Sequence, residues 1–74
     1  MTNYYKEKRR LALLIDDTLK NMGEHTEIDM RHWWYELSKR FELSEKAFID
    51  QCVKAAHHFG LTLDAENLII YKGG

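Results

Sequence analysis

Apolar residues recur at helical spacing in three stretches of the chain and alternate with polar residues in a fourth. The clearest stretch runs from Ser44 to Gly60, and its apolar positions are Phe48, Cys52, Ala55 and Phe59. Ser44 is a favourable N-cap residue, and Gly60 is able to adopt the left-handed conformation that closes a helix. The pattern therefore predicts a helix over residues 44–59 with one apolar face.

A longer amphipathic stretch precedes it, from Asn3 to Met22. The stripe expected to face the core consists of Tyr4, Leu11, Ile15, Leu19 and Met22, with Leu14 and Thr18 beside it. Asn3 is the candidate N-cap, and Gly23 is the expected stop. Leu13 lies about half a turn away from the stripe, among charged residues. It is either an isolated exposed Leu or a contact with a second subunit.

A second helical pattern starts after Asp29, the expected N-cap of a helix from Met30 to about Phe41. The preceding connector is predicted to contain a very short strand at 26–28, with Ile28 turned inward. The buried stripe predicted for the helix is Met30, Trp34, Leu37 and Phe41, with Trp33 at its edge. Only residues 42–44 then separate this helix from the next one, which is a turn length typical of a helix-turn-helix.

After Gly60 the period changes from helical spacing to alternation. Leu61–Leu63 and Leu68–Tyr71 are predicted strands, joined by a polar turn at 64–67, and residues 72–74 are expected to be a tail. Because a two-stranded hairpin is weak alone, the strand around Ile28 is expected to join it. The fold class predicted for 1–74 is a single α+β domain, mostly helical, with three helices and a C-terminal β-hairpin.

Size and composition restrict the classes of function. A chain of 74 residues buries a modest core, so formation of a homodimer is an expected source of extra stability. Cys52 is the single cysteine, and its place on an apolar helix face fits a core position in a reducing, cytoplasmic compartment. No stretch reaches the apolar length of a membrane span, and no signal-peptide pattern is present. The net charge of −1 argues against a nucleic-acid binder that depends on overall charge alone.

The order of helix, short strand, helix, turn, helix and hairpin resembles that of the winged helix-turn-helix domains. The resemblance covers the chain from Tyr4 to Tyr71 in element order and hydrophobic pattern, and includes no residue motif. It implies that the helix at 44–59 is the recognition helix that enters the DNA major groove. It also implies that the turn at 64–67 is the wing. Asp64 and Glu66 depart from the family pattern, because a DNA-binding wing usually carries Arg or Lys.

The function favoured on these grounds is that of a small DNA-binding protein, a regulator of transcription or replication. Its size is similar to that of regulators encoded by phages and other mobile elements. The residues expected to contact double-stranded DNA on helix 44–59 are Lys46, Gln51, Lys54 and His58. Outside this helix, Lys6, Arg9 and Arg10 are expected to contact DNA, and Lys8 lies between them in the same basic group. Lys39 is also expected to contact DNA, and it forms a second basic group with Arg31 and Arg40. Whether these groups meet in space is left open by the sequence.

An alternative is a winged-helix module that binds another protein. The acidic turn and the aromatic run at 33–35 favour it, since Trp and Tyr dominate interface hot spots. Trp33 and Tyr35 are its candidate contact residues, and Leu13 is the candidate subunit contact. An edge Trp such as Trp33 is, however, more often covered by a neighbouring element, such as the N-terminal helix or the hairpin.

Catalytic and metal-binding chemistry is not expected. The chain has no Gly-rich phosphate loop, no serine elbow and no carboxylate pair in a defensible cleft. Among the four histidines, His57 and His58 are adjacent, so their side chains diverge by about 100° on a helix. The sequence therefore predicts a protein that is not an enzyme and that uses neither a metal nor another cofactor.

Overall fold

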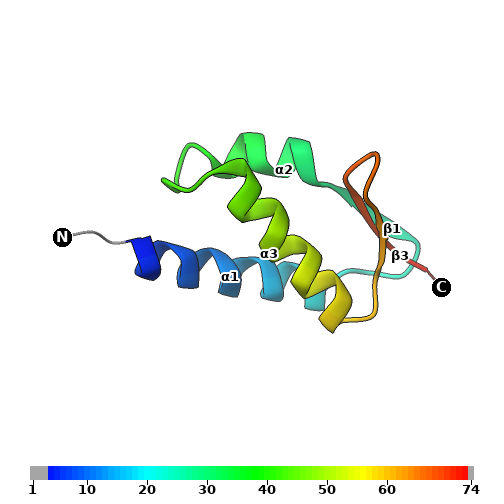
Figure 1. Ribbon diagram of the computed structural model, residues 1–74. Coiled ribbons are helices and arrows are strands. Elements are labelled where there is room, and N and C mark those ends of the chain that lie inside the picture. Colours follow the sequence, from blue (N-terminus) through cyan, green and yellow to red (C-terminus); the bar gives the residue numbers. More distant parts are fainter. Residues whose placement is uncertain (1–3, 74) are drawn as a thin grey trace.

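The computed structural model describes residues 4–73 and contains three helices and three strands in the order α1, β1, α2, α3, β2, β3 (Figure 1). The fold is α+β and mostly helical, as the sequence predicts. The N-terminal end of α1 and the sheet lie at opposite ends of an elongated molecule, which measures 45 × 20 × 16 Å. No helix among the described residues is long and apolar enough to cross a membrane.

Helix α1 spans Tyr4–Lys20 and buries Leu11, Ile15 and Leu19, which confirms most of the predicted stripe. Tyr4 is the exception, because its side chain is 44% exposed at the free end of the helix. The core does not extend that far, so helical spacing alone places this residue wrongly. The predicted cap, Asn3, lies outside the described residues.

Helix α2 spans Met30–Leu37, and Asp29 caps it as predicted by accepting a hydrogen bond from the Arg31 backbone N–H at 3.0 Å. The predicted end at Phe41 is wrong. The Leu37 carbonyl accepts hydrogen bonds from the N–H groups of both Arg40 and Phe41, at 2.8 and 3.1 Å, which tightens the last turn. The connection to the next helix therefore covers 38–44 rather than 42–44, and Phe41 enters the core from a turn.

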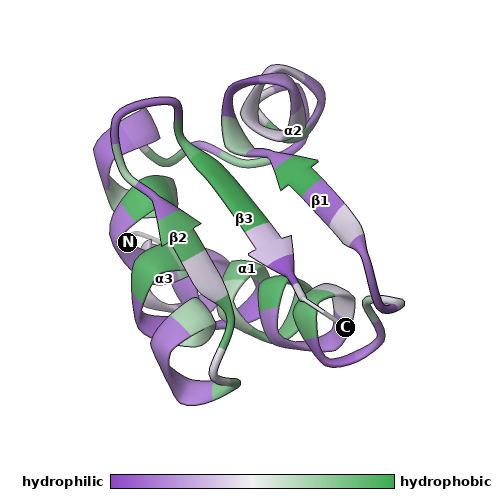
Figure 2. Cartoon of the chain, turned by 90° about the vertical axis from the view of Figure 1, so that its right-hand side faces the viewer, coloured by the Kyte–Doolittle hydropathy of each residue, from purple (hydrophilic) through white to green (hydrophobic). Residues whose placement is uncertain are grey.

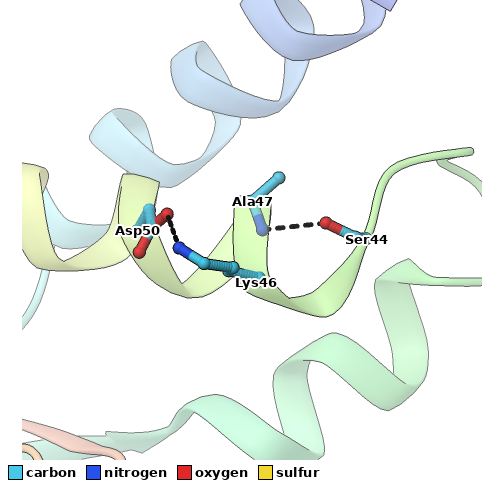
Figure 3. A network of polar contacts seen from close by, with 4 residues as sticks. All are labelled: Ser44, Lys46, Ala47 and Asp50. Atoms are coloured by element: carbon cyan, nitrogen blue, oxygen red, sulfur yellow. Dashed lines mark hydrogen bonds and ion pairs between the residues drawn. The ribbon is translucent and has the colours of Figure 1, made fainter.

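Helix α3 spans Glu45–His58 and begins and ends where the sequence predicts, within one residue. The Ser44 hydroxyl accepts a hydrogen bond from the Ala47 N–H at 3.1 Å (Figure 3). Gly60 has a φ of 68°, the left-handed conformation expected of it. Phe48, Cys52 and Ala55 are buried, which confirms the predicted apolar face except at Phe59, whose side chain is only half-buried.

Strands β1 (Thr26–Asp29), β2 (Thr62–Asp64) and β3 (Ile69–Lys72) form an antiparallel sheet in the order β1-β3-β2. Ile28 and Leu63 both pair with Ile70, which confirms that the short strand joins the hairpin. The apolar segments of the three strands lie side by side across the sheet (Figure 2). Lys72 belongs to β3 rather than to the predicted tail, and its Nζ donates to the Met22 carbonyl at 3.0 Å.

The core holds α2 against α3 through aromatic rings. Trp33 packs edge-on against Phe48, and Trp34 stacks on it, each with 5.2 Å between ring centroids. Both Trp side chains are only half-buried, so the prediction that Trp34 is buried is wrong. Helix α2 is short and lies on the surface of the domain, so it leaves part of each indole exposed.

Candidate nucleic-acid interface

The basic residues of α1 and those after α2 lie at the same end of the molecule. The first turns of α1 and the 38–44 connection are both at the end marked N in Figure 1. The guanidinium carbon of Arg10 lies 5.8 Å from the centre of the Phe41 ring, so α1 and the connection are in direct contact. Lys39 and Arg40 follow α2 at this point. Arg31 lies at the opposite end of α2, next to the sheet.

The structure separates charge along its length. Residues 4–10 and 38–46, called the basic end below, carry seven of the eleven Lys and Arg side chains but three of the twelve Asp and Glu side chains. Their formal charge is therefore +4, and the rest of the chain carries −5. A net charge of −1 thus conceals a strongly dipolar molecule. A patch of this kind attracts phosphate regardless of the overall charge.

Lys46 is paired on the outer face of α3. Its Nζ lies 3.0 Å from the Asp50 carboxylate, one helical turn further along (Figure 3). The two side chains are 83% and 60% exposed, and exposed pairs at this spacing contribute only about 0.3–0.5 kcal/mol. Lys46 is therefore free to exchange Asp50 for a phosphate, at a small cost.

A cleft of about 430 Å³ separates the first turns of α1 from α3. Its charged and polar lining consists of Tyr4 and Lys8 of α1 and of Asp50, Gln51 and Lys54 of α3. Gln51 is half-buried in this wall, so it does not stand on the outward face as a reader of adenine is expected to. His58 lines a neighbouring hollow together with Asp16 and Lys54.

The carboxylate of Asp64 stabilises the turn between β2 and β3. The Asp64 carboxylate accepts hydrogen bonds from the N–H groups of Glu66 and Asn67, both at 3.1 Å, and from the Asn67 side chain at 2.9 Å. The Asn67 side chain, followed by its backbone N–H, lowers the pKa of this carboxyl. Asp64 therefore stays ionised and holds the turn. Together with Glu66 it makes the predicted wing acidic.

The aromatic residues proposed as protein contacts differ in their surroundings. Tyr35 is 63% exposed, with the Lys39 Nζ 4.7 Å from its ring centre. Trp33 is half-buried and packs on Phe48, but its remaining surface lines a hollow of about 330 Å³. The residues around this hollow include His32 and the acidic residues Glu27, Asp29 and Glu36. Trp33 is therefore in part a core residue and in part the wall of an acidic hollow.

Leu13 and Cys52 occupy opposite environments. Leu13 is 62% exposed on α1, on the side away from the core. Cys52 is fully buried, and burial raises the pKa of its thiol to about 12. Such a thiol is a packing group rather than a nucleophile. Among residues 4–73, no group of His, Cys, Asp and Glu side chains is arranged to hold a metal ion.

The chain was compared with protein-family models, with curated proteins and with solved structures, and no match was found in any of the three.

Proposed function

We propose that this chain is a small DNA-binding regulator of the winged helix-turn-helix class, which holds the phosphate backbone mainly with its basic end. The observation that carries the proposal is the charge of +4 gathered on residues 4–10 and 38–46. Phosphate contacts supply much of the affinity of DNA-binding proteins, and they require a local positive surface.

The element order and the β1-β3-β2 sheet support the winged-helix class. In such domains the helix after the turn enters the major groove, which here is α3. The outer face of α3 carries Lys46, Asp50 and Lys54, a mixed set with no Arg to read guanine. We therefore expect contacts to phosphates to dominate, and discrimination between sequences to be modest.

The chemistry of binding follows from which cations are accessible. Lys6, Arg9 and Arg40 are exposed, and no ion pair of theirs is found among the described residues. Each phosphate neutralised by such a side chain releases condensed counterions, so binding is expected to weaken steeply as salt is added. Arg10 is partly engaged already, since it pairs with Glu7 at 2.9 Å.

The test is a fluorescence anisotropy titration of random-sequence duplex DNA at several salt concentrations. Lys39→Glu and Arg31→Glu form a matched pair, because both residues are exposed and sit at the two ends of α2. Lys39→Glu, at the basic end, is expected to weaken binding about tenfold, while Arg31→Glu changes it less than threefold. Absence of binding at low salt, or equal effects of the two variants, contradicts the proposal.

A second candidate is binding of a protein through the acidic hollow beside Trp33. The specific observation is an open apolar surface ringed by Glu27, Asp29 and Glu36, which suits a partner that carries Lys or Arg. Trp33 itself is unsuitable as a test, because its contact with Phe48 supports the fold. Glu36→Lys reverses one of the three acidic charges around the hollow and leaves the contact between Trp33 and Phe48 in place. Loss of a partner in this variant, with DNA binding intact, would favour the second candidate.

A further inference from the structure

The outer face of α1 is a surface of alternating charge around one apolar residue. Leu13 is 62% exposed at the middle of this 17-residue helix, on the side opposite the buried stripe. Arg9 and Asp16 are seven residues apart, which places them almost in line along one flank of Leu13. Arg10 and Asp17 repeat the arrangement along the other flank. In both lines the cation precedes Leu13 and the carboxylate follows it.

We infer that this face binds a second copy of the chain, with the two α1 helices antiparallel and Leu13 against Leu13 at a two-fold axis. Such an axis sets each flank of α1 beside the same flank of the partner's α1, and the two helices run in opposite directions. Arg9 lies about 6 Å before Leu13 along the helix, and Asp16 about 4.5 Å after it. Arg9 of one copy therefore comes beside Asp16 of the other, and Arg10 beside Asp17, twice each by symmetry.

The same pairing suits the charge of the whole molecule. Because α1 runs from the basic end toward the sheet, the antiparallel pair sets each basic end beside the negatively charged part of the other copy. A parallel pair would place the two ends of charge +4 together and would be repelled. Charge complementarity thus selects a second copy in the antiparallel orientation.

Other charged groups on or near this face oppose or compete with the pairing. Lys6 and Lys20 stand seven residues before and after Leu13, so the antiparallel pair brings them together as like charges. Lys54 and His58 of α3 line the hollow that contains Asp16, and Glu7 holds Arg10. A patch along one helix about 25 Å long is also smaller than the roughly 800 Å² per partner of a standard interface. The dimer is therefore expected to be weak, with a dissociation constant in the micromolar range or above.

The repulsion between Lys6 and Lys20 provides the sharpest variant. Lys20→Glu replaces two like-charge contacts with two attractive ones, and is expected to tighten the dimer about tenfold. A parallel pair of α1 helices is not strengthened by the same substitution, because it sets residue 20 of one copy beside residue 20 of the other. Arg31→Glu makes the same change of charge away from α1 and outside the basic end, and is the matched control, with a change of less than twofold.

The experiment is sedimentation equilibrium of the free protein over a wide concentration range, at about 50 mM and about 500 mM salt, where screening differs strongly. Leu13→Glu is expected to weaken association at least tenfold, and Arg9→Glu or Asp16→Arg severalfold. The double variant Arg9→Glu/Asp16→Arg is expected to restore the dimer. Circular dichroism should show unchanged folding, because these side chains lie outside the core.

Three results would overturn the inference. The first is a monomer at every concentration in both the unsubstituted protein and Lys20→Glu. The second is a dimer whose dissociation constant is unaffected by Leu13→Glu. The third is a double variant that associates no more tightly than either single variant. Arg9 and Arg10 belong to both the proposed dimer face and the proposed DNA-binding surface. The measurement is therefore made without DNA, so that failure of the dimer is distinguishable from failure of the proposed DNA binding.

Discussion

The two ends of this molecule use their charged residues differently. At the sheet end, Asp29 caps α2, Asp64 holds the β2–β3 turn, and Lys72 donates to the Met22 carbonyl. At the basic end, most cations extend into solvent, and the ion pairs found there within residues 4–73 are Arg10–Glu7 and Lys46–Asp50. Charges at one end build the fold, while charges at the other are available to a partner. The net charge of the chain, which averages the two, is a poor guide to what the chain binds.

The largest effect is expected from breaking the core that joins the two ends. Phe48→Ala removes the ring on which Trp33 and Trp34 pack, which costs about 3–5 kcal/mol. That is most of the stability expected of a domain this small, so the variant should be largely unfolded. Loss of the circular dichroism transition and rapid labelling of Cys52 by a thiol reagent would measure it.

Phe48→Ala also tests whether the folded basic end matters. If the unfolded variant bound DNA as tightly as the unsubstituted chain, unstructured positive charge would account for binding, and the contrast between the two ends would have no functional meaning. We expect its affinity to fall at least tenfold, because unfolding separates residues 4–10 from 38–46.

The next largest effect is expected from reversing charges at the basic end alone. The triple variant Lys6→Glu/Lys8→Glu/Lys39→Glu reverses three exposed charges and is expected to weaken DNA binding at least 100-fold at low salt. Its free energy of unfolding should change by no more than about 1 kcal/mol, since surface substitutions of this kind are usually mild. DNA titration and urea unfolding of the same sample measure the two quantities. A large loss of stability together with affinity would mean that these lysines build the fold.

At the sheet end, Asp64→Asn is expected to show the opposite behaviour, with a lower Tm and unchanged DNA affinity. The folded-state pKa of Asp64 is below its usual value of 3.8, so its ionised form favours the folded state. This contribution is present above the pKa of the unfolded chain, and it is lost as pH falls through the lower folded-state pKa. The difference in Tm between the unsubstituted protein and Asp64→Asn should therefore be largest at neutral pH and vanish in strong acid. A difference that persists there would contradict the role given to the carboxylate.

The smallest effect is expected at the tip of the turn. Glu66→Lys reverses an exposed charge whose carboxylate makes no hydrogen bond or ion pair among the described residues. If DNA lies at the basic end, screening at physiological salt should limit the gain in affinity to less than threefold. A gain of tenfold or more in the anisotropy titration would show that the turn approaches DNA as a wing.

Much of the fold could be predicted because its signals are local. Asp29 and Ser44 act through their own side chains on the next turn, and Gly60 supplies a conformation that other residues avoid. The end of α2 could not be predicted, because no Gly or Pro marks it. Phe41 is buried, as the helical pattern predicts, although it lies in the connection after α2, and only the tertiary structure shows this.

The candidate interface was predictable residue by residue but not as a surface. Lys6, Arg10 and Lys39 are recognisable as basic groups, yet their common location depends on the contact between Arg10 and Phe41. Helical periodicity predicts that Gln51 lies on the outward face of its helix, whereas it lies in the cleft because α1 packs along that side. Helical periodicity gives the face that is buried most deeply, but it does not give the direction from which a neighbouring helix approaches.

The measurement that tests the central claim most directly is the salt dependence of DNA binding by the unsubstituted protein and by the triple variant. We expect the logarithm of the binding constant to fall linearly with the logarithm of salt concentration. Reversal of three lysines should flatten the slope by roughly two to three, since each phosphate contact contributes about 0.9. A slope identical in the two proteins, or no binding by either at low salt, would contradict the assignment of the basic end as the DNA-binding surface.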